Sequence, residues 1–202
     1  QSCWEQDCEE EGSSLGQLRE VAAFDHMGED QEEFADIYKH TILPRLQRLE
    51  GVKQVIADFL QGLEGERVAL LVFGSKAYVQ SPLTTDLDTL QALLKRTQVG
   101  MAGPHTALGD AIGLAIRQFD ASEVEQRLLI LLSDGADTGS RMSPVNAAQI
   151  AADRQVRIIT IAIGDPNGSG ENRVDTATLK AIAAATGGAD FTAADQAALA
   201  QV

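Results

Sequence analysis

Apolar side chains recur along this chain with two periods, one typical of helices and one typical of buried strands. Between residues 46 and 63 they return every three or four positions, which predicts an amphipathic helix ending near the glycines at 62 and 65. Predominantly apolar runs at 68–73, 128–132 and 156–163 are typical of central strands covered on both faces. Further helices are predicted at 86–94, 106–119, 144–154 and 175–185, and short strands at 77–80 and 189–192.

The alternation of helices and strands favours the α/β class, with a mostly parallel central sheet between two layers of helices. A chain of 202 residues with 44% hydrophobic residues is large enough for one such domain. Residues 1–18 are acidic and contain little apolar material, which predicts a disordered tail. Cys3 and Cys8 lie in this tail. We expect unpaired thiols there, although an oxidising compartment could close a small disulfide loop.

The net charge of −14 argues against nucleic acid or an anionic membrane surface as a partner, since both would be repelled. It is compatible with cation binding or a basic protein partner, and equally with simple solubility. No stretch approaches the roughly 18 to 20 apolar residues that a membrane span requires. We therefore expect no direct insertion of this chain into a membrane.

The strongest candidate for a site lies where the strand at 128–132 runs into Ser133, Asp134 and Gly135. Ligands of open α/β sheets collect at the carboxyl ends of strands, so Asp134 is placed where a site is expected. Thr106 stands near the start of a predicted helix. A hydroxyl and a carboxylate are ligands that a hard cation accepts. Ser133 lacks the GxSxG context of a nucleophile, so we expect no hydrolase of that type.

Four stretches of this chain resemble the von Willebrand factor A domain, and most closely the bacterial Bat (aerotolerance) type. They are LEGVK at 49–53, LVFGSKAYVQSPLT at 71–84, TALGDAIGL at 106–114 and the segment 179–188. The resemblance covers 46–202 in order and spacing, whereas 19–45 diverge. It implies a Rossmann-like three-layer sandwich over 19–202 that acts as an adhesion-type protein-interaction module rather than an enzyme.

The resemblance also implies a metal-ion-dependent adhesion site, made from a DxSxS loop after the first strand, a threonine and an aspartate. In this chain the DxSxS position after the predicted strand at 21–24 reads Asp25, His26, Met27, Gly28, Glu29. Met27 is a soft ligand and Glu29 replaces a hydroxyl by a charge. Two hypotheses stay open. Either carboxylates replace the serines and the metal site is Asp25, Glu29, Thr106 and Asp134, or the site has decayed or the segment is an altered N-terminus, which leaves a metal-free fold.

For an intact site the expected ion is Mg²⁺, with Ca²⁺ or Mn²⁺ as alternatives, and the replaced hydroxyls predict weak or absent binding. The family implies a protein partner that contributes a carboxylate to the metal, and a membrane-anchored bacterial parent with the domain on the periplasmic rather than the cytoplasmic side. The alternatives are a metal-free structural subunit of a membrane-associated complex and, less favoured, a magnesium-dependent hydrolase using Asp134 and Asp110.

The remaining polar candidates are predicted to have no role in a site. Asp110 is expected to be an acid favoured by the dipole of an early helical turn, in preference to an indirect metal contact. Asp137 is expected to be a solvated loop residue. The three histidines, at 26, 40 and 105, are scattered without the spacing of a zinc site or a catalytic base.

Overall fold

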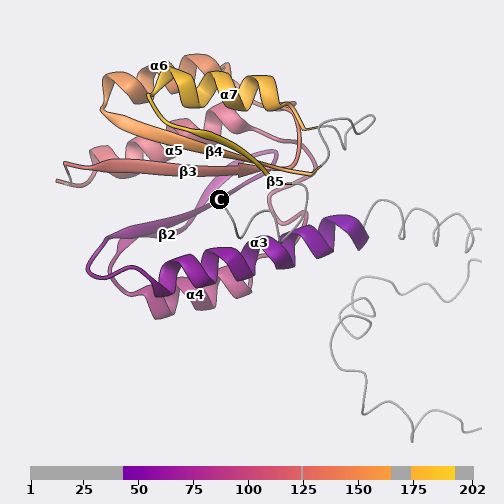
Figure 1. Ribbon diagram of the computed structural model, residues 1–202, viewed down its shortest axis with the longest axis vertical. Coiled ribbons are helices and arrows are strands. Elements are labelled where there is room, and N and C mark those ends of the chain that lie inside the picture. Colours follow the sequence, from indigo (N-terminus) through magenta and orange to yellow (C-terminus); the bar gives the residue numbers. More distant parts are fainter. Residues whose placement is uncertain (1–42, 124, 165–173, 194–202) are drawn as a thin grey trace, which may run out of the picture. The chain divides into compact units, whose positions relative to one another are not determined.

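Helices and strands alternate along the chain as the hydrophobic pattern predicts (Figure 1). The structure is a computed structural model that describes residues 43–123, 125–164 and 174–193. The predicted tail, the predicted strand at 21–24, and both Asp25 and Glu29 lie outside these ranges. The elements are α3 (Leu43–Gln61), β1 (Val68–Phe73), β2 (Ala77–Thr84), α4 (Leu87–Lys95), α5 (Leu108–Asp120), β3 (Arg127–Ser133), α6 (Pro144–Asp153), β4 (Val156–Ile163), α7 (Thr176–Ala185) and β5 (Asp190–Ala193).

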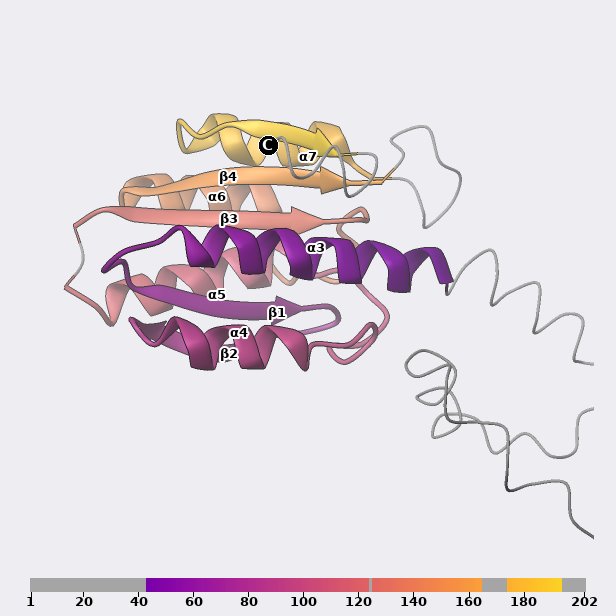
Figure 2. The same ribbon diagram turned by 60° about the horizontal axis from the view of Figure 1, so that its bottom comes forward.

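The strands belong to two sheets. In the first, β3, β4 and β5 pair in parallel in that order, with Leu131 opposite Thr160 and Ile161 opposite Phe191. In the second, β1 and β2 form an antiparallel pair. The arrowheads of β1, β3, β4 and β5 point the same way in Figure 2, so the carboxyl ends of these strands meet at one edge. This edge is called the carboxyl edge below, and the opposite one the amino edge.

Helices cover both faces of the strands, as the predicted three-layer class requires. Figure 1 shows α5, α6 and α7 on one side and α3 and α4 on the other. The main core lies under α5, α6 and α7, and it includes Ile112, Leu131 and Ile158. Phe73 of β1 packs against the same core, so this core joins the two sheets. On the other face Val52 and Val55 of α3 pack against a smaller cluster on β3, β4 and β5.

The edge strand β2 is longer than the sequence analysis predicts. It continues through Ser81 and Pro82 to Thr84, whereas the proline was expected to close it. Proline removes a donor but is tolerated in a strand that pairs on one side. Within the described residues β2 pairs with β1 and with no other strand, and shifts in register accompany the pairing around Leu70.

The sequence predicts that β1 is a central strand covered on both sides, and within the described residues it is partly buried and pairs on one edge. All six of its residues are apolar, yet each is only partly buried. The structure pairs β1 with β2 on one edge and describes no strand on the other, and β3 likewise pairs with β4 alone.

The sequence predicts no segment that inserts into a membrane. In the ranges that the structure describes, none of the helices combines the length and the apolar character needed to cross a bilayer.

Candidate metal site at the carboxyl edge of the sheet

β3 delivers Asp134 to the carboxyl edge through a tight turn. Ser133 is buried at the end of the strand, and its hydroxyl donates to the carbonyl oxygen of Gly135 at 3.2 Å and accepts from the Gly135 amide at 3.4 Å. The serine that the sequence analysis excluded as a nucleophile therefore shapes this turn. Asp134 itself is exposed, which leaves its carboxylate accessible from solvent.

Thr106 lies beside this turn, as the sequence analysis predicts. A Cβ atom added to Gly135 would stand 3.4 Å from the Thr106 hydroxyl oxygen. Thr106 is half-buried in the loop that leads into α5. The structure thus brings together two of the four predicted site residues, and the other two, Asp25 and Glu29, lie outside the described residues.

Residues after the end of β1 form hydrogen bonds with residues 105–107, which lead into α5 and are called the threonine loop below. The carbonyl oxygen of Gly74 accepts from the Ala107 amide at 2.9 Å, and the Ser75 hydroxyl accepts from the His105 amide at 3.1 Å. Gly74 has no room for a side chain, since a Cβ there would come within 2.7 Å of the carbonyl oxygens of Ala102 and Gly103. These contacts tie the threonine loop to the turn of the β1–β2 hairpin.

The loop after Asp134 also supports the threonine loop. The Asp137 carboxylate accepts from the Leu108 amide at 2.9 Å, and the Ser140 hydroxyl accepts from the Gly109 amide at 2.8 Å. A short hydrogen bond from Ser140 to Asp137 joins the two acceptors. The prediction that Asp137 is a solvated loop residue is therefore wrong, because the start of α5 lies against it.

Asp110 is also engaged by this loop. Its carboxylate accepts from the Arg141 amide at 3.1 Å, on the first turn of α5 where the helix dipole favours an acid. Gly109 allows the close approach, since a Cβ there would come within 2.1 Å of the Met142 carbonyl oxygen.

Neither Asp137 nor Ser140 was predicted as part of the site. Their partners lie about 30 positions earlier in the chain, where no local sequence signal could reveal them.

Chemically, the edge offers hard oxygen ligands from Thr106 and Asp134, which suit magnesium or calcium. Across the described ranges, no three His, Cys, Asp or Glu side chains are grouped as a metal ion would need. Thr106 and Asp134 therefore fit half of a hard-cation site, and the other two predicted ligands, Asp25 and Glu29, lie outside these ranges. The exposed His105 contributes its backbone amide to the loop.

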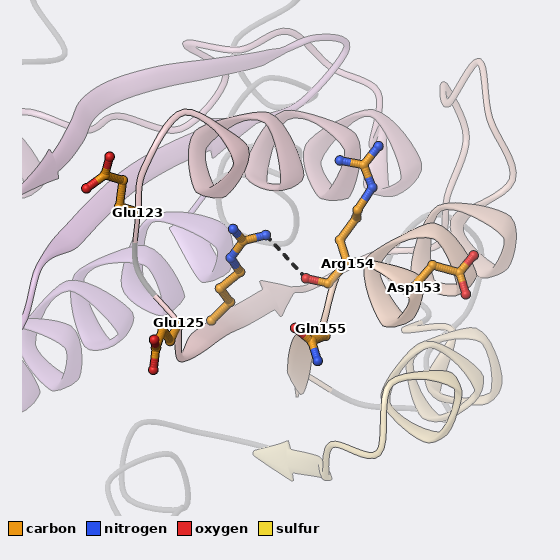
Figure 3. Close-up of a pocket in the computed structure, with 6 residues that line it drawn as sticks. Glu123, Glu125, Asp153, Arg154 and Gln155 are labelled. Atoms are coloured by element: carbon orange, nitrogen blue, oxygen red, sulfur yellow. Dashed lines mark hydrogen bonds between the residues drawn. The ribbon is translucent and has the colours of Figure 1, made fainter.

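A hollow also lies at the amino edge, far from Thr106 and Asp134 along β3 (Figure 3). Its walls carry Glu123, Glu125, Arg127, Asp153, Arg154 and Gln155. Arg127 donates to the Arg154 carbonyl oxygen at 3.3 Å, and Asp120 forms ion pairs with both arginines. Both arginines of the hollow are therefore engaged by neighbouring groups.

Two solved structures from Bacteroides are similar to this chain. One is an aerotolerance-related membrane protein from Bacteroides fragilis, 23% identical, with a TM-score of 0.67 over 76% of this chain and 85% of that one. The other is the conserved hypothetical protein BatB from Bacteroides thetaiotaomicron, 26% identical, with a TM-score of 0.65 over the same shares, 76% and 85%.

Two further similarities cover smaller parts of the proteins concerned. Proximal thread matrix protein 1 from the mussel byssus, in a form with a zinc-occupied MIDAS motif, is 21% identical, with a TM-score of 0.61 over 75% of this chain and 38% of that one. An uncharacterized protein of Borreliella burgdorferi is 28% identical over 117 residues, which are 58% of this chain and 34% of that protein. The chain thus spans about a third of this relative's length.

Family membership rests on a longer match than any of these pairwise similarities. The match covers residues 44–202, which include both sheets, the turn at Asp134 and the loop at Thr106. The chain belongs to the von Willebrand factor type A domain family.

Proposed function

We propose that this domain is a non-enzymatic protein-interaction module that binds its partner through a divalent cation at the carboxyl edge. The observation that carries the proposal is the position of the Thr106 hydroxyl beside the turn that holds Asp134. The proposed ligands are Thr106 and Asp134 together with Asp25 and Glu29, and the partner supplies a further carboxylate. The mussel protein with zinc in its MIDAS motif supports metal binding on this fold.

The ion we propose is Mg²⁺, with Ca²⁺ and Mn²⁺ as alternatives, because the ligand atoms are hard oxygens. The binding is expected to be weak. Met27 and Glu29 stand where two serine hydroxyls would bind the ion directly, and water has to fill the vacated positions. Affinity in about the millimolar range is expected, as in weak extracellular calcium modules.

The test is calorimetric titration of the whole chain with Mn²⁺ and with Mg²⁺, alongside thermal unfolding in EDTA. Free ion at ten times the dissociation constant should stabilise the fold by about 1.4 kcal/mol. Asp134→Ala and Thr106→Ala should each remove the binding, whereas Asp153→Ala should leave it unchanged, because this exposed residue lies at the amino edge. Metal binding that survives Asp134→Ala would contradict the proposed site.

A second experiment separates the two hypotheses for the divergent loop. If Met27 and Glu29 weaken a working site, the double change Met27→Ser with Glu29→Ser should raise the affinity for Mg²⁺. If carboxylates have replaced the serines, the same change should lower the affinity, since it removes a charged ligand.

A second candidate function is a metal-free structural subunit of a membrane-associated complex. The partial burial of every residue of β1 favours it, since within the described residues this apolar strand pairs on one edge only, and such a strand is suited to docking. Binding of the partner in the presence of EDTA, with no effect of Asp134→Ala, would establish this function over the first.

For localisation, we propose a membrane-anchored parent with this domain on the periplasmic side. The Bacteroides fragilis neighbour is described as a membrane protein, which supports the anchor. Protease treatment of intact spheroplasts should then cleave the domain, and complete protection of the domain would place it on the other side.

A further inference from the structure

The loop at 135–141 and the start of α5 are joined by hydrogen bonds that run in both directions. We infer that Asp137 and Ser140, together called the clamp below, are positioning residues. They join the threonine loop to the loop at 135–141 and so hold the Thr106 hydroxyl at a set distance from Asp134. This inference rests on the proposed metal site, because it explains how that half of the site is formed in advance of the ion.

The clamp replaces a cap that α5 lacks. The helices α4 and α7 begin after Asp86 and Asp175, and each carboxylate accepts from the amide three residues later at 3.0 Å. The corresponding residue of α5 is Ala107, whose methyl group accepts no hydrogen bond. The first amides of this helix find their acceptors on Asp137 and Ser140 instead, so the helix start depends on the distant loop.

Thr106 is held between the same two segments. Its amide donates to the Thr138 hydroxyl at 3.0 Å, and its carbonyl oxygen accepts from the amides of Thr138 and Gly139 at 2.9 and 3.1 Å. Asp134 stands three positions before Asp137 on this loop. A displacement of the clamp would therefore move the hydroxyl and the carboxylate relative to each other.

The consequence for metal binding follows from preorganisation. A site with few protein ligands cannot use many contacts to draw its loops together, so the ligands it has must be in place before the ion arrives. Groups that orient metal ligands without touching the metal commonly change the affinity about 10- to 100-fold when they are removed. We expect Asp137 to behave in this way, with no contact to the ion itself.

The experiment compares Mn²⁺ affinity in four variants of the whole chain. Asp137→Ala removes the acceptor and should weaken binding about tenfold or more. Asp137→Asn keeps an oxygen that accepts from Leu108 and Ser140, and it should retain affinity within about twofold of the unchanged chain, as expected of a role that depends on hydrogen bonding. Asp153→Ala removes the same charge at the amino edge and should have no effect. Ser140→Ala, the milder change, keeps the inference testable if Asp137→Ala does not fold.

Amide hydrogen exchange supplies a readout that needs no metal. In Asp137→Ala the amides of Thr106, Leu108 and Gly109 should exchange faster, while amides of β4 stay protected. Unchanged exchange at Thr106, or unchanged Mn²⁺ affinity despite faster exchange, would overturn the inference. If the unchanged chain binds no Mn²⁺, the proposed function fails, and the exchange of Thr106 still decides whether the clamp positions this loop.

Discussion

Of the strands β1 and β4, β1 is the more apolar, yet β4 is the more deeply buried. β1 is apolar at every position and has no fully buried residue, whereas β4 contains Arg157 and Thr160 and buries six of its eight residues. β4 pairs with β3 and β5, and α6 and α7 cover one of its faces. β1 pairs with β2 on one edge of the described sheet. Burial is therefore decided by the neighbours of a strand more than by its own side chains.

The largest test of this difference places a charge in each strand. Ile158→Asp in β4 buries a carboxylate in the main core, which should cost several kcal/mol of a total stability of about 5 to 15 kcal/mol and unfold the domain. Val72→Asp in β1 should leave a folded protein with a lower melting temperature, because this half-buried side chain can reach water. Circular dichroism melting curves measure both. Equal losses would show that β1 is as well covered as β4.

A second test compares two leucines of the same strand, β3. Leu131 is 3% exposed in the main core, so Leu131→Ala should destabilise by about 2 to 5 kcal/mol. Leu128 is 48% exposed, so Leu128→Ala should change the free energy of unfolding by no more than about 0.5 kcal/mol. Urea denaturation distinguishes these values. A large loss at Leu128 would mean that this end of β3 is covered in solution.

The third test compares two aspartates that cap helices. Asp86 caps α4, which lies beside the β1–β2 hairpin, and Asp175 caps α7, which lies beside the parallel sheet. Each also accepts from a threonine hydroxyl at 2.6 Å. Asp175→Ala should cost about 1 kcal/mol, since the cap is partly buried against the core. Asp86→Ala should cost less, because its cap is exposed. The reverse order in denaturant titrations would contradict a link between cap strength and burial.

The smallest effect concerns pH and the Asp86 cap. Hydrogen bonds from the Thr89 hydroxyl and amide lower the pKa of Asp86 below its ordinary value of 3.8. The charged form of Asp86 is therefore favoured in the folded state. Its contribution to the free energy of unfolding is fully present above pH 3.8 and is lost as the pH falls through the lower pKa of the folded state. Asp86→Asn keeps an acceptor but does not titrate. The stability difference between the unchanged chain and this variant should shrink below pH 3.8, whereas a constant difference would show that the charge contributes nothing.

Several features were predictable because their signals are local. The apolar runs predicted β1, β3 and β4, and the helical pattern predicted α4 and α7, which the structure shows to be capped by Asp86 and Asp175. Asp134 was predicted at a site because it ends a strand, and Thr106 was joined to it by ligand chemistry and by the family resemblance; the structure places the Thr106 hydroxyl beside the turn at Asp134. Asp137 was misjudged because its main partner is the amide of Leu108, 29 positions earlier.

The amino-acid sequence by itself determined which segments form helices and strands, where two helices are capped, and that a carboxylate, Asp134, follows the end of β3. These properties depend on contacts between residues a few positions apart or on the period of the side chains. The tertiary structure alone decided that β4 is buried between two strands while β1 is partly buried in the described part of the chain, and that α5 takes its cap from Asp137 and Ser140. Both outcomes depend on which distant segments become neighbours in space, and the local pattern of polar and apolar residues does not specify those pairings.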